Sequence, residues 1–355
     1  LVIFDTTLAE APATWEALRR GTFATRTYLA DTVPENEPDS PMEGYLQVDA
    51  ARAVLAAAGL DYDSLVIAAA QPGFRPLALP LTARGRVATS FRAFTSWNVL
   101  GWLPGTVRPD EFVLYMAHWD HVGRDTTLVG DQIFNGAMDN ATGTASILEL
   151  ARRFVREKPP PERSILFLGL TAEESGLLGS RFYTREPVFP LNRTVAAINI
   201  DMLVSYGKTR DVYMIGAGKS DLDAYVENAA AALGMVALPD ERTAQRLFYR
   251  SDHINFARAG VPALFLDPGM DYIREGRDWG EERVEQFMDE TYHKVSDEYN
   301  ENWNFDGIID YLEIVYQTGL KLASEDTFPN WNERDEFRPV RDESLRNGNA
   351  SPADE

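Results

Sequence analysis

Residues 111–123, EFVLYMAHWDHVG, join an apolar run to three side chains that can bind metal ions. The run EFVLYMA is rich in aromatic and aliphatic residues and has the length of a buried β-strand. His118, Asp120 and His121 follow it within four positions, and the whole chain contains only four histidines. The stretch therefore predicts a buried strand whose carboxyl end carries either an ordinary polar loop or one wall of a metal site.

Apolar runs of the same kind recur further along the chain. They are SILFLGLTAEE at 164–174, TVAAINIDM at 194–202, DVYMIGAG at 211–218 and GVPALFLD at 260–267. Helical patterns alternate with them at 140–158, near 220–233 and near 305–323. Strands alternating with helices predict an α/β sandwich.

The two ends of the chain differ from this regular part. We expect residues 1–85 to form a partial insert and linker, with a short helix in 48–60 that ends at Gly59. Residues 86–325 are expected to form the main domain, and residues 326–355 a polar C-terminal segment. Trp331 and Phe337 predict that the nearer part of this segment docks, and the tail beyond about Val340 is expected to be disordered.

The composition excludes several classes of protein. With 34 basic and 55 acidic residues, the formal charge of -21 repels phosphate backbones and anionic lipids. No window approaches the ~18 uninterrupted apolar residues of a membrane helix. Neither nucleic acid nor a membrane is therefore an expected partner. Because the chain has no cysteine, any metal must be held by oxygen and imidazole.

Candidate metal ligands cluster where the predicted strands end. In open α/β sheets, functional side chains collect just beyond the carboxyl ends of the strands. Two imidazoles and several carboxylates fall at such places or in the turns beside them: His118, Asp120, Asp139, Glu173, Glu174, Asp201 and His293. Such a set matches the ligand preference of Zn²⁺ or a similar divalent ion.

Local geometry suggests how some of these residues divide their work. His118 and Asp120 are two apart and point the same way, so the Asp120 carboxylate can accept the second ring N–H of His118 or an N–H group of a neighbour. Glu173 and Glu174 are adjacent, so their side chains diverge. One can bind a metal while the other acts as a general base on water.

Six motifs in a fixed order resemble the zinc exopeptidases of peptidase family M28, which include secreted bacterial leucyl aminopeptidases. The motifs are HWDHVG, NGAMDNATG, TAEESGLLGS, NIDM, RSDHINFARAGVPA and YHKVSDE. The resemblance runs from about Trp97 to Phe337. It implies a three-layer α/β sandwich with a central mixed, mostly parallel β-sheet flanked by helices.

The resemblance also implies residue roles around two zinc ions. His118 and Asp201 would bind one ion, Glu174 and His293 the other, and Asp139 would bridge both. Of the remaining residues, Glu173 would be the general base, Asp120 the outer partner of His118, and Tyr292 and Arg250 stabilisers of the oxyanion. The peptide bond between Asp139 and Asn140 is expected to be cis. His121 and His253 are interpreted as structural or supporting residues.

These roles imply a metal-dependent exopeptidase that removes the N-terminal residue of a peptide substrate. A metal-bridging hydroxide would attack the carbonyl after Glu173 takes its proton. Met202 and Phe248 are candidates to line an apolar pocket for the first residue. The resemblance places the protein in the periplasm or outside the cell. Residues 1 to about 45 resemble the latter part of a protease-associated insert domain, so we expect the chain to begin inside such a domain.

Three alternatives remain open from the sequence. A carboxypeptidase or dipeptidase acting on acidic C-termini would need a cationic pocket, which Arg246, Arg250 and Arg274 could supply. A glutaminyl-cyclase-like acyltransferase would use a single zinc ion. A receptor-like or scaffold protein would have kept the fold and lost the metal.

Overall fold

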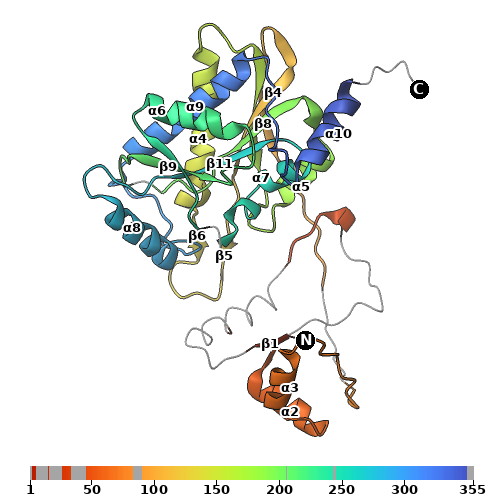
Figure 1. The fold of residues 1–355 in the computed structure, drawn as a ribbon. Coiled ribbons are helices and arrows are strands. Elements are labelled where there is room, and N and C mark those ends of the chain that lie inside the picture. The colour runs from red at the N-terminus through yellow and green to blue at the C-terminus, as the bar shows by residue number, and fades with distance from the viewer. Residues whose placement is uncertain are drawn as a thin grey trace. The chain divides into compact units, whose positions relative to one another are not determined.

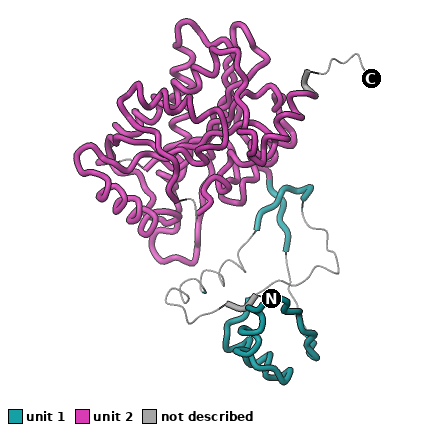
Figure 2. The backbone as a smooth tube through the Cα atoms, in the orientation of Figure 1, with its two compact units in different colours: residues 1–94 teal, residues 95–355 magenta. Residues whose placement is uncertain are grey.

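The chain folds into two compact units, residues 1–94 and residues 95–355, which are described separately (Figure 2). The structure, a computed structural model, describes residues 2–4, 15, 26–32, 45–82, 90–204, 206–242 and 245–349. All of the predicted site residues belong to the larger unit.

Among the residues that the structure describes, the smaller unit contains a pair of short parallel strands and several short helices. Strand β1 (Val2–Phe4) pairs with β2 (Tyr45–Gln47), which leads directly into α2 (Val48–Ala57). The predicted helix in 48–60 is therefore confirmed, and Gly59 follows it with a left-handed φ of 73°. The described part of this unit also includes the helices η1 (Ala30–Thr32) and α3 (Tyr62–Ala69).

A seven-stranded sheet forms the centre of the larger unit (Figure 1). In spatial order its strands are β10 (Val236–Pro239), β9 (Asp211–Ile215), β11 (Ala263–Pro268), β8 (Thr194–Asn199), β4 (Arg108–His118), β7 (Arg163–Leu170) and β3 (Val99–Leu103). The pairs β3–β7 and β11–β9 are antiparallel, whereas the other four are parallel. The predicted mixed, mostly parallel sheet is confirmed.

Helices cover both faces of this sheet because its central strands are apolar on both sides. In β4, Val113 and Tyr115 face one hydrophobic cluster, whereas Leu114 and Met116 face another. The first cluster includes side chains of α4 (Thr142–Arg156), α6 (Leu222–Ala232) and α9 (Asp306–Ser324). The second includes side chains of α5 (Leu178–Arg185) and α7 (His253–Arg258). Figure 1 shows the resulting three-layer sandwich.

The elements that border the edge of the sheet where the candidate site lies are the hairpin β5 (Gly123–Arg124) and β6 (Ile133–Phe134), the short helices η2 (Ala137–Ala141) and η5 (Leu247–Tyr249), and α8 (Arg277–Glu290). Helix η3 (Leu191–Arg193) lies at the opposite edge, because it leads into the first residue of β8. Within the ranges that the structure describes, no helix has the length and apolar character needed to cross a bilayer.

The C-terminal segment docks on the larger unit and ends in a helix, α10 (Arg338–Asn349). Trp331 is fully buried and donates its Nε1–H to the carbonyl of Gly260 at 3.0 Å, and Phe337 is buried beside it. Docking of these two aromatic residues is confirmed. The expectation of disorder beyond Val340 is wrong for residues 341–349. Arg341 is buried in this helix, where its guanidinium donates to the carbonyl of Thr194 at 3.0 Å.

Candidate metal centre

Three neighbouring parallel strands deliver candidate ligands to one edge of the sheet. His118 is the last residue of β4, which lies between β7 and β8. Glu173 and Glu174 follow the end of β7, and Asp201 lies just beyond the end of β8. Because the carboxyl ends of parallel strands meet at the same edge, these side chains converge although 83 residues separate the first from the last.

Asp139 reaches the same place from η2, a single π-helical turn at the start of α4. The peptide bond between Asp139 and Asn140 is cis, as expected. The Asn140 side chain ties this turn to the strand-end loop, because its Nδ2 donates to the carbonyl of Ile200 at 3.0 Å and its Oδ1 accepts from the backbone N–H of Met202 at 3.1 Å.

His293 comes from the turn that follows α8, where its backbone has a left-handed φ of 54°. Four residues later, the fully buried Asp297 links this turn to the Asp139 turn. Its carboxylate accepts hydrogen bonds from the backbone N–H groups of Met138, at 2.9 Å, and Asp139, at 3.1 Å. The two loops are thereby held together by one carboxylate.

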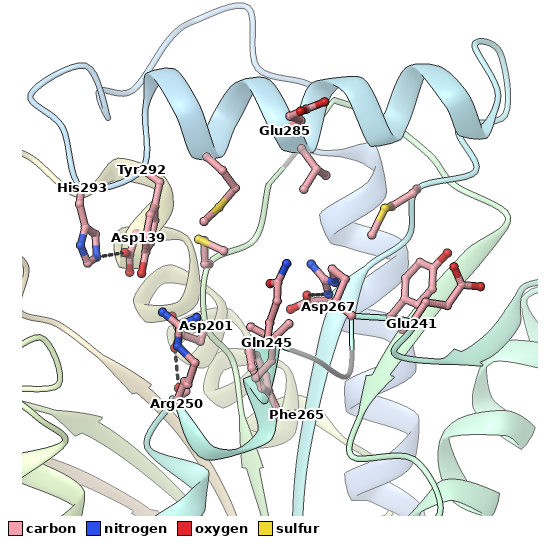
Figure 3. A pocket seen from close by; sticks show the side chains of 18 of the residues that line it. Asp139, Asp201, Glu241, Gln245, Arg250, Phe265, Asp267, Glu285, Tyr292 and His293 are labelled. Carbon is pink, nitrogen blue, oxygen red and sulfur yellow. Dashed lines mark hydrogen bonds and ion pairs between the residues drawn. The ribbon is translucent and has the colours of Figure 1, made fainter. Parts of the chain in front are cut away.

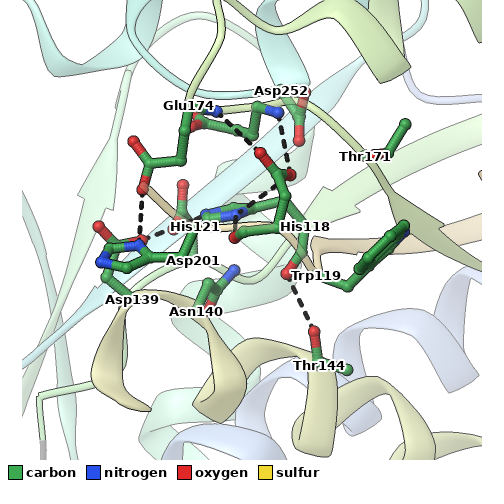
Figure 4. Close-up of polar contacts among 12 residues, drawn as sticks. His118, Trp119, His121, Asp139, Asn140, Thr144, Thr171, Glu174, Asp201 and Asp252 are labelled. Carbon is green, nitrogen blue, oxygen red and sulfur yellow. Dashed lines mark hydrogen bonds and ion pairs between the residues drawn. The ribbon is translucent and has the colours of Figure 1, made fainter. Parts of the chain in front are cut away.

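The five predicted ligands meet around Asp139, and Figure 4 shows His118, Glu174 and Asp201 near it. His118 Nε2 lies 3.1 Å from Asp201 Oδ1 and 3.3 Å from Asp139 Oδ1. On the other side, His293 Nε2 lies 3.2 Å from Asp139 Oδ2 and 3.1 Å from Glu174 Oε2. Asp139 therefore presents a different oxygen to each histidine.

These distances match those between neighbouring ligands of one metal ion. Bond lengths of about 2.0–2.2 Å around a tetrahedral Zn²⁺ place adjacent ligand atoms about 3.3 Å apart. All four contacts around Asp139 fall between 3.1 and 3.3 Å. The chemistry of the donors, imidazole and carboxylate, is also that of a zinc site.

The negative charges of the carboxylates at the centre favour the binding of cations. Asp139 and Asp201 are buried, and the Glu174 side chain is only 11% exposed. Within the described ranges, the ion pairs of these three carboxylates are all with histidines and none is with Lys or Arg. Because isolated buried carboxylates are strongly unfavourable, bound cations are the natural compensation, and the residues present fit them.

Glu173 and Glu174 are adjacent but differ in their acidity. Burial, reinforced by the negative charge of Asp201, raises the pKa of Glu173 to about 10. Burial also acts to raise the pKa of Glu174, but contacts with His121 and His293 outweigh it and lower that pKa to about 2. Both shifts arise from the protein groups alone, and a nearby cation lowers the pKa of a carboxyl. Glu174 is therefore ionised, whereas Glu173 would be ionised, and able to accept a proton, once bound cations lower its pKa.

Asp120 supports the centre in a different way from the one expected. The second ring nitrogen of His118, Nδ1, lies 3.0 Å from the backbone carbonyl of Asp120 but 3.9 Å from its carboxylate. The carboxylate instead accepts hydrogen bonds from the backbone N–H groups of Glu173, at 3.0 Å, and Glu174, at 3.3 Å. The side chain is drawn to these two N–H groups because the loop after β7 leaves them without backbone partners.

Asn98 supports the same loop and was not identified from the sequence. Its Oδ1 accepts from the backbone N–H of Thr171 at 3.1 Å, and its Nδ2 donates to the carbonyl of Gly179 at 2.9 Å. One amide thus joins both ends of the loop that carries Glu173 and Glu174. A Cβ atom on Gly179 would lie 2.2 Å from the carbonyl oxygen of Thr171, so this close approach requires glycine.

Tyr292 and Arg250 both line the cavity in front of the ligands. The Tyr292 ring stacks on His293 with centroids 3.9 Å apart, and burial and the nearby carboxylates raise the pKa of its hydroxyl. The hydroxyl therefore keeps its proton. His253 lies elsewhere, fully buried between the rings of Phe248 and Phe265.

The cavity has a volume of about 520 Å³ and extends from the candidate ligands beneath α8 (Figure 3). The apolar side chains that line it include Met202, Phe265, Met270, Val284 and Met288. Met202 thus lies where the sequence suggested. Phe248 does not line the cavity, because it packs into a cluster with Trp331 and Phe337.

Two arginines at the far end of the cavity are each flanked by two carboxylates. The Arg242 guanidinium contacts Asp240, at 3.0 Å, and Asp267. The Arg277 guanidinium lies 2.7 Å from both Glu241 and Glu281. Figure 3 shows Glu241 at the opposite end from Tyr292 and His293. Both arginines are therefore neutralised by the protein itself.

The chain is similar to several known proteins. The sequence profile of peptidase family M28 matches residues 98–317. Aminopeptidase NAALADL1 of Mus musculus is 38% identical over 141 residues, 38% of this chain and 17% of that protein. Aminopeptidase YwaD of Bacillus subtilis (strain 168) is 28% identical over 231 residues, 61% of this chain and 47% of that protein.

Leupeptin-inactivating enzyme 1 of Streptomyces exfoliatus is 28% identical over 218 residues, 59% of this chain and 46% of that protein. The chain therefore spans less than half the length of these three relatives. Among solved structures, a zinc aminopeptidase from Bacillus subtilis aligns with a TM-score of 0.48 and 23% identity, covering 68% of this chain and 52% of that one.

Proposed function

The chain belongs to peptidase family M28, and we propose that it is an aminopeptidase that uses two zinc ions to hydrolyse the N-terminal peptide bond of peptides. The observation that carries the proposal is the position of Asp139. Its two oxygens face two separate imidazoles, His118 at 3.3 Å and His293 at 3.2 Å. A carboxylate shared in this way is suited to bridge a pair of ions.

The proposed ligands form two sets that share Asp139. His118 and Asp201 would hold one ion, whereas Glu174 and His293 would hold the other. When bound, such ions polarise a carbonyl oxygen as Lewis acids and lower the pKa of water from 15.7 towards about 7. The buried positions of His118, Asp139 and Asp201 limit competing bulk water and strengthen these electrostatic effects.

Glu173 is the proposed general base. It lines the cavity beside the ligands, and the Asp120 carboxylate fixes its backbone through the N–H group. In this role Glu173 takes a proton from the attacking water and returns it to the leaving amine. Glu173 is half-buried, so its carboxyl is shielded from part of the bulk solvent, which helps to keep the transferred proton within the site.

Tyr292 and Arg250 are the proposed donors to the developing oxyanion. The Tyr292 hydroxyl keeps its proton, so it can donate a hydrogen bond as negative charge appears on the carbonyl oxygen. Arg250 lines the same cavity, and no ion pair in the described ranges occupies its guanidinium. It is therefore free to face a negatively charged oxygen.

The shape of the cavity favours an apolar first residue. Its apolar lining includes thioethers, an aromatic ring and a valine, which suit an aliphatic or aromatic substrate side chain.

The proposal places the enzyme in the periplasm or outside the cell, on the basis of family resemblance alone.

The charge of the cavity disfavours the carboxypeptidase alternative. Of Arg246, Arg250 and Arg274, only Arg250 lines the cavity. The carboxylates that line it outnumber the arginines: they are Asp139, Glu173, Glu174, Asp201, Glu241, Asp267, Glu281, Glu285 and Asp289. An acidic C-terminal residue would meet repulsion there, whereas a protonated α-amino group would be attracted.

Metal content and a substrate panel test the proposal together. We expect about two zinc ions per chain and hydrolysis of amino-acid amides that have a free α-amino group, fastest for apolar residues. N-acylated peptides should remain intact. Cleavage of the blocked peptides at their C-terminal bond would favour the carboxypeptidase, lactam formation with one ion the cyclase, and a stable metal-free protein the scaffold.

A further inference from the structure

We propose that His121 is a sixth protein ligand of the metal centre, on the side formed by Asp139, Glu174 and His293. The inference rests on the proposed two-ion centre and adds to it a residue that the family pattern leaves without a role. It makes the two sides unequal, because one would hold a single imidazole and the other would hold two.

The first observation is that His121 is buried without a hydrogen-bonding partner. Its side chain is 7% exposed, and neither ring nitrogen has a hydrogen bond in the described ranges. Glu174 Oε1 is likewise buried and lacks a hydrogen bond, although it lies 2.8 Å from His121 Nδ1 (Figure 4). The two atoms are close but not aligned as donor and acceptor. Because buried polar atoms need partners, a cation that both atoms contact would satisfy them.

The separation of the two imidazoles supports a shared ion. A zinc–nitrogen bond of about 2.0–2.1 Å places the centre of an imidazole ring about 3.2 Å from the ion. Two such rings at tetrahedral to trigonal angles then have centres about 5.2–5.5 Å apart. The rings of His121 and His293 are 5.6 Å apart and inclined at 76°, close to this expectation.

The short contact to Glu174 is also compatible with common ligation. In a five-coordinate site, ligand atoms at right angles lie about 2.9 Å apart, near the measured 2.8 Å. Glu174 faces His121 through Oε1 and His293 through Oε2. The ligand atoms of His121, Asp139 and Glu174 also lie within 4.8 Å of one another. Together these residues provide a complete five-atom set for one ion.

The fold makes room for this histidine. Residues Gly123 and Phe134 pair in the β5–β6 hairpin, which brings His121 alongside Gly136. Gly136 has a left-handed φ of 64°, and a Cβ atom there would lie 2.6 Å from His121 Cγ. Any larger residue would displace the imidazole, so the loop is shaped to hold the ring where it is.

Cobalt substitution tests the proposal because only a coordinated imidazole shows large through-bond shifts of its ring protons in the NMR spectrum of a Co²⁺ protein. The chain has only four histidines, so the coordinated ones can be counted. With two cobalt ions bound, we expect three sets of shifted imidazole signals from the native protein. His121→Gln and His121→Asn should each remove one set, and should weaken binding of one ion by roughly 100-fold in a metal titration.

The outcomes separate this inference from the proposed function. Two bound ions with only two imidazole sets, both unchanged in His121→Gln, would mean that His121 merely neighbours Glu174, and would overturn the inference while leaving the two-ion centre intact. Failure of the native protein to bind cobalt would overturn both. Circular dichroism of each variant shows whether a lost signal reflects ligation or unfolding.

Discussion

The two sides of the metal centre are built on different kinds of structure. On one side, His118 and Asp201 stand at the ends of adjacent central strands, and their side chains are 2% and 12% exposed. On the other side, His293 stands in a turn after α8, and its side chain is 37% exposed. The strand side is fixed by the sheet ladder, whereas the turn side depends on side-chain contacts.

This difference shows which contacts fix the positions of the candidate ligands on each side. Pairing of β4 with β8 sets the distance between His118 and Asp201 before any ion binds. The position of His293 depends on Asp297, whose carboxylate joins its turn to the backbone of Asp139. We therefore expect the strand side to tolerate loss of outer contacts better than the turn side.

The largest effect should come from removing the proposed general base, Glu173, next to the strand side. Glu173→Gln keeps the size of the side chain and leaves all proposed ligands in place. We expect kcat to fall by roughly 10²–10⁴-fold, with metal content and melting temperature close to native. Steady-state kinetics on an amino-acid amide, with elemental analysis of the same sample, measures both. Activity within ten-fold of native would show that another group accepts the proton.

Replacement of one carboxylate oxygen of Asp297 by an amide group should affect the turn side more than the strand side. In Asp297→Asn, an amide N–H₂ faces a backbone N–H group of Met138 or Asp139, so one hydrogen bond is lost and the turn shifts. We expect one of the two ions to bind about 10–100-fold more weakly, measured by titration of the metal-free protein.

Glu298→Gln provides the matched control, because it makes the same chemical change at the next residue. Glu298 is exposed and accepts only a surface hydrogen bond from Asn135. Equal weakening of both ions in Asp297→Asn, or equal loss in the control, would contradict the division into two sides.

A chelator should remove the two ions in separate steps. Because His293 is more exposed than His118, water and chelator reach the turn side first. We expect the proposed turn-side ion to be lost about ten-fold or more faster than the other, which corresponds to about 1.4 kcal/mol in activation free energy. A time course with excess chelator, followed by elemental analysis, resolves the steps. A single transition with simultaneous loss of both ions would show that the two sides behave as one.

The smallest expected effect concerns stability and pH beneath the strand side. Burial raises the pKa of Asp252 from 3.8 to about 7. Between pH 4 and 7 the unfolded chain therefore releases this proton while the folded chain keeps it, so stability falls as the pH rises through this window and levels off above pH 7.

Asp252→Asn removes this pH-dependent loss but weakens the hydrogen bond from Ser180. We expect a net gain on the order of 1 kcal/mol at pH 8 and no gain near pH 4. Thermal unfolding at both values checks this, and an equal change at the two pH values would disprove the linkage.

The sequence predicts the strand side well because both of its residues follow directly from apolar strands. His118 closes the run at 111–117 and Asp201 closes the run at 194–200, so the sheet topology alone brings them together. The packing of helices on both faces of the sheet follows from the same apolar pattern. These features depend on periodicity, which a single sequence displays.

Contacts between loops were not predicted, because periodicity carries no information about them. Asp297 and Asn98 act through backbone N–H and carbonyl groups, which every residue possesses and no motif marks. The same limitation explains Asp120, whose carboxylate prefers two loop N–H groups over the imidazole predicted for it. Only three-dimensional placement shows which backbone groups lack partners.

The docked C-terminal segment has a practical consequence for anyone who designs a shorter form of this protein. A boundary at residue 325, where the chain turns polar, would discard Trp331 and Arg341. Arg341 holds the carbonyl of Thr194, the first residue of the strand that leads to Asp201. Removal of the tail would therefore loosen the amino end of β8, whose carboxyl end positions the proposed ligand Asp201. We expect such a truncation to lower activity although the cut lies far from the candidate site.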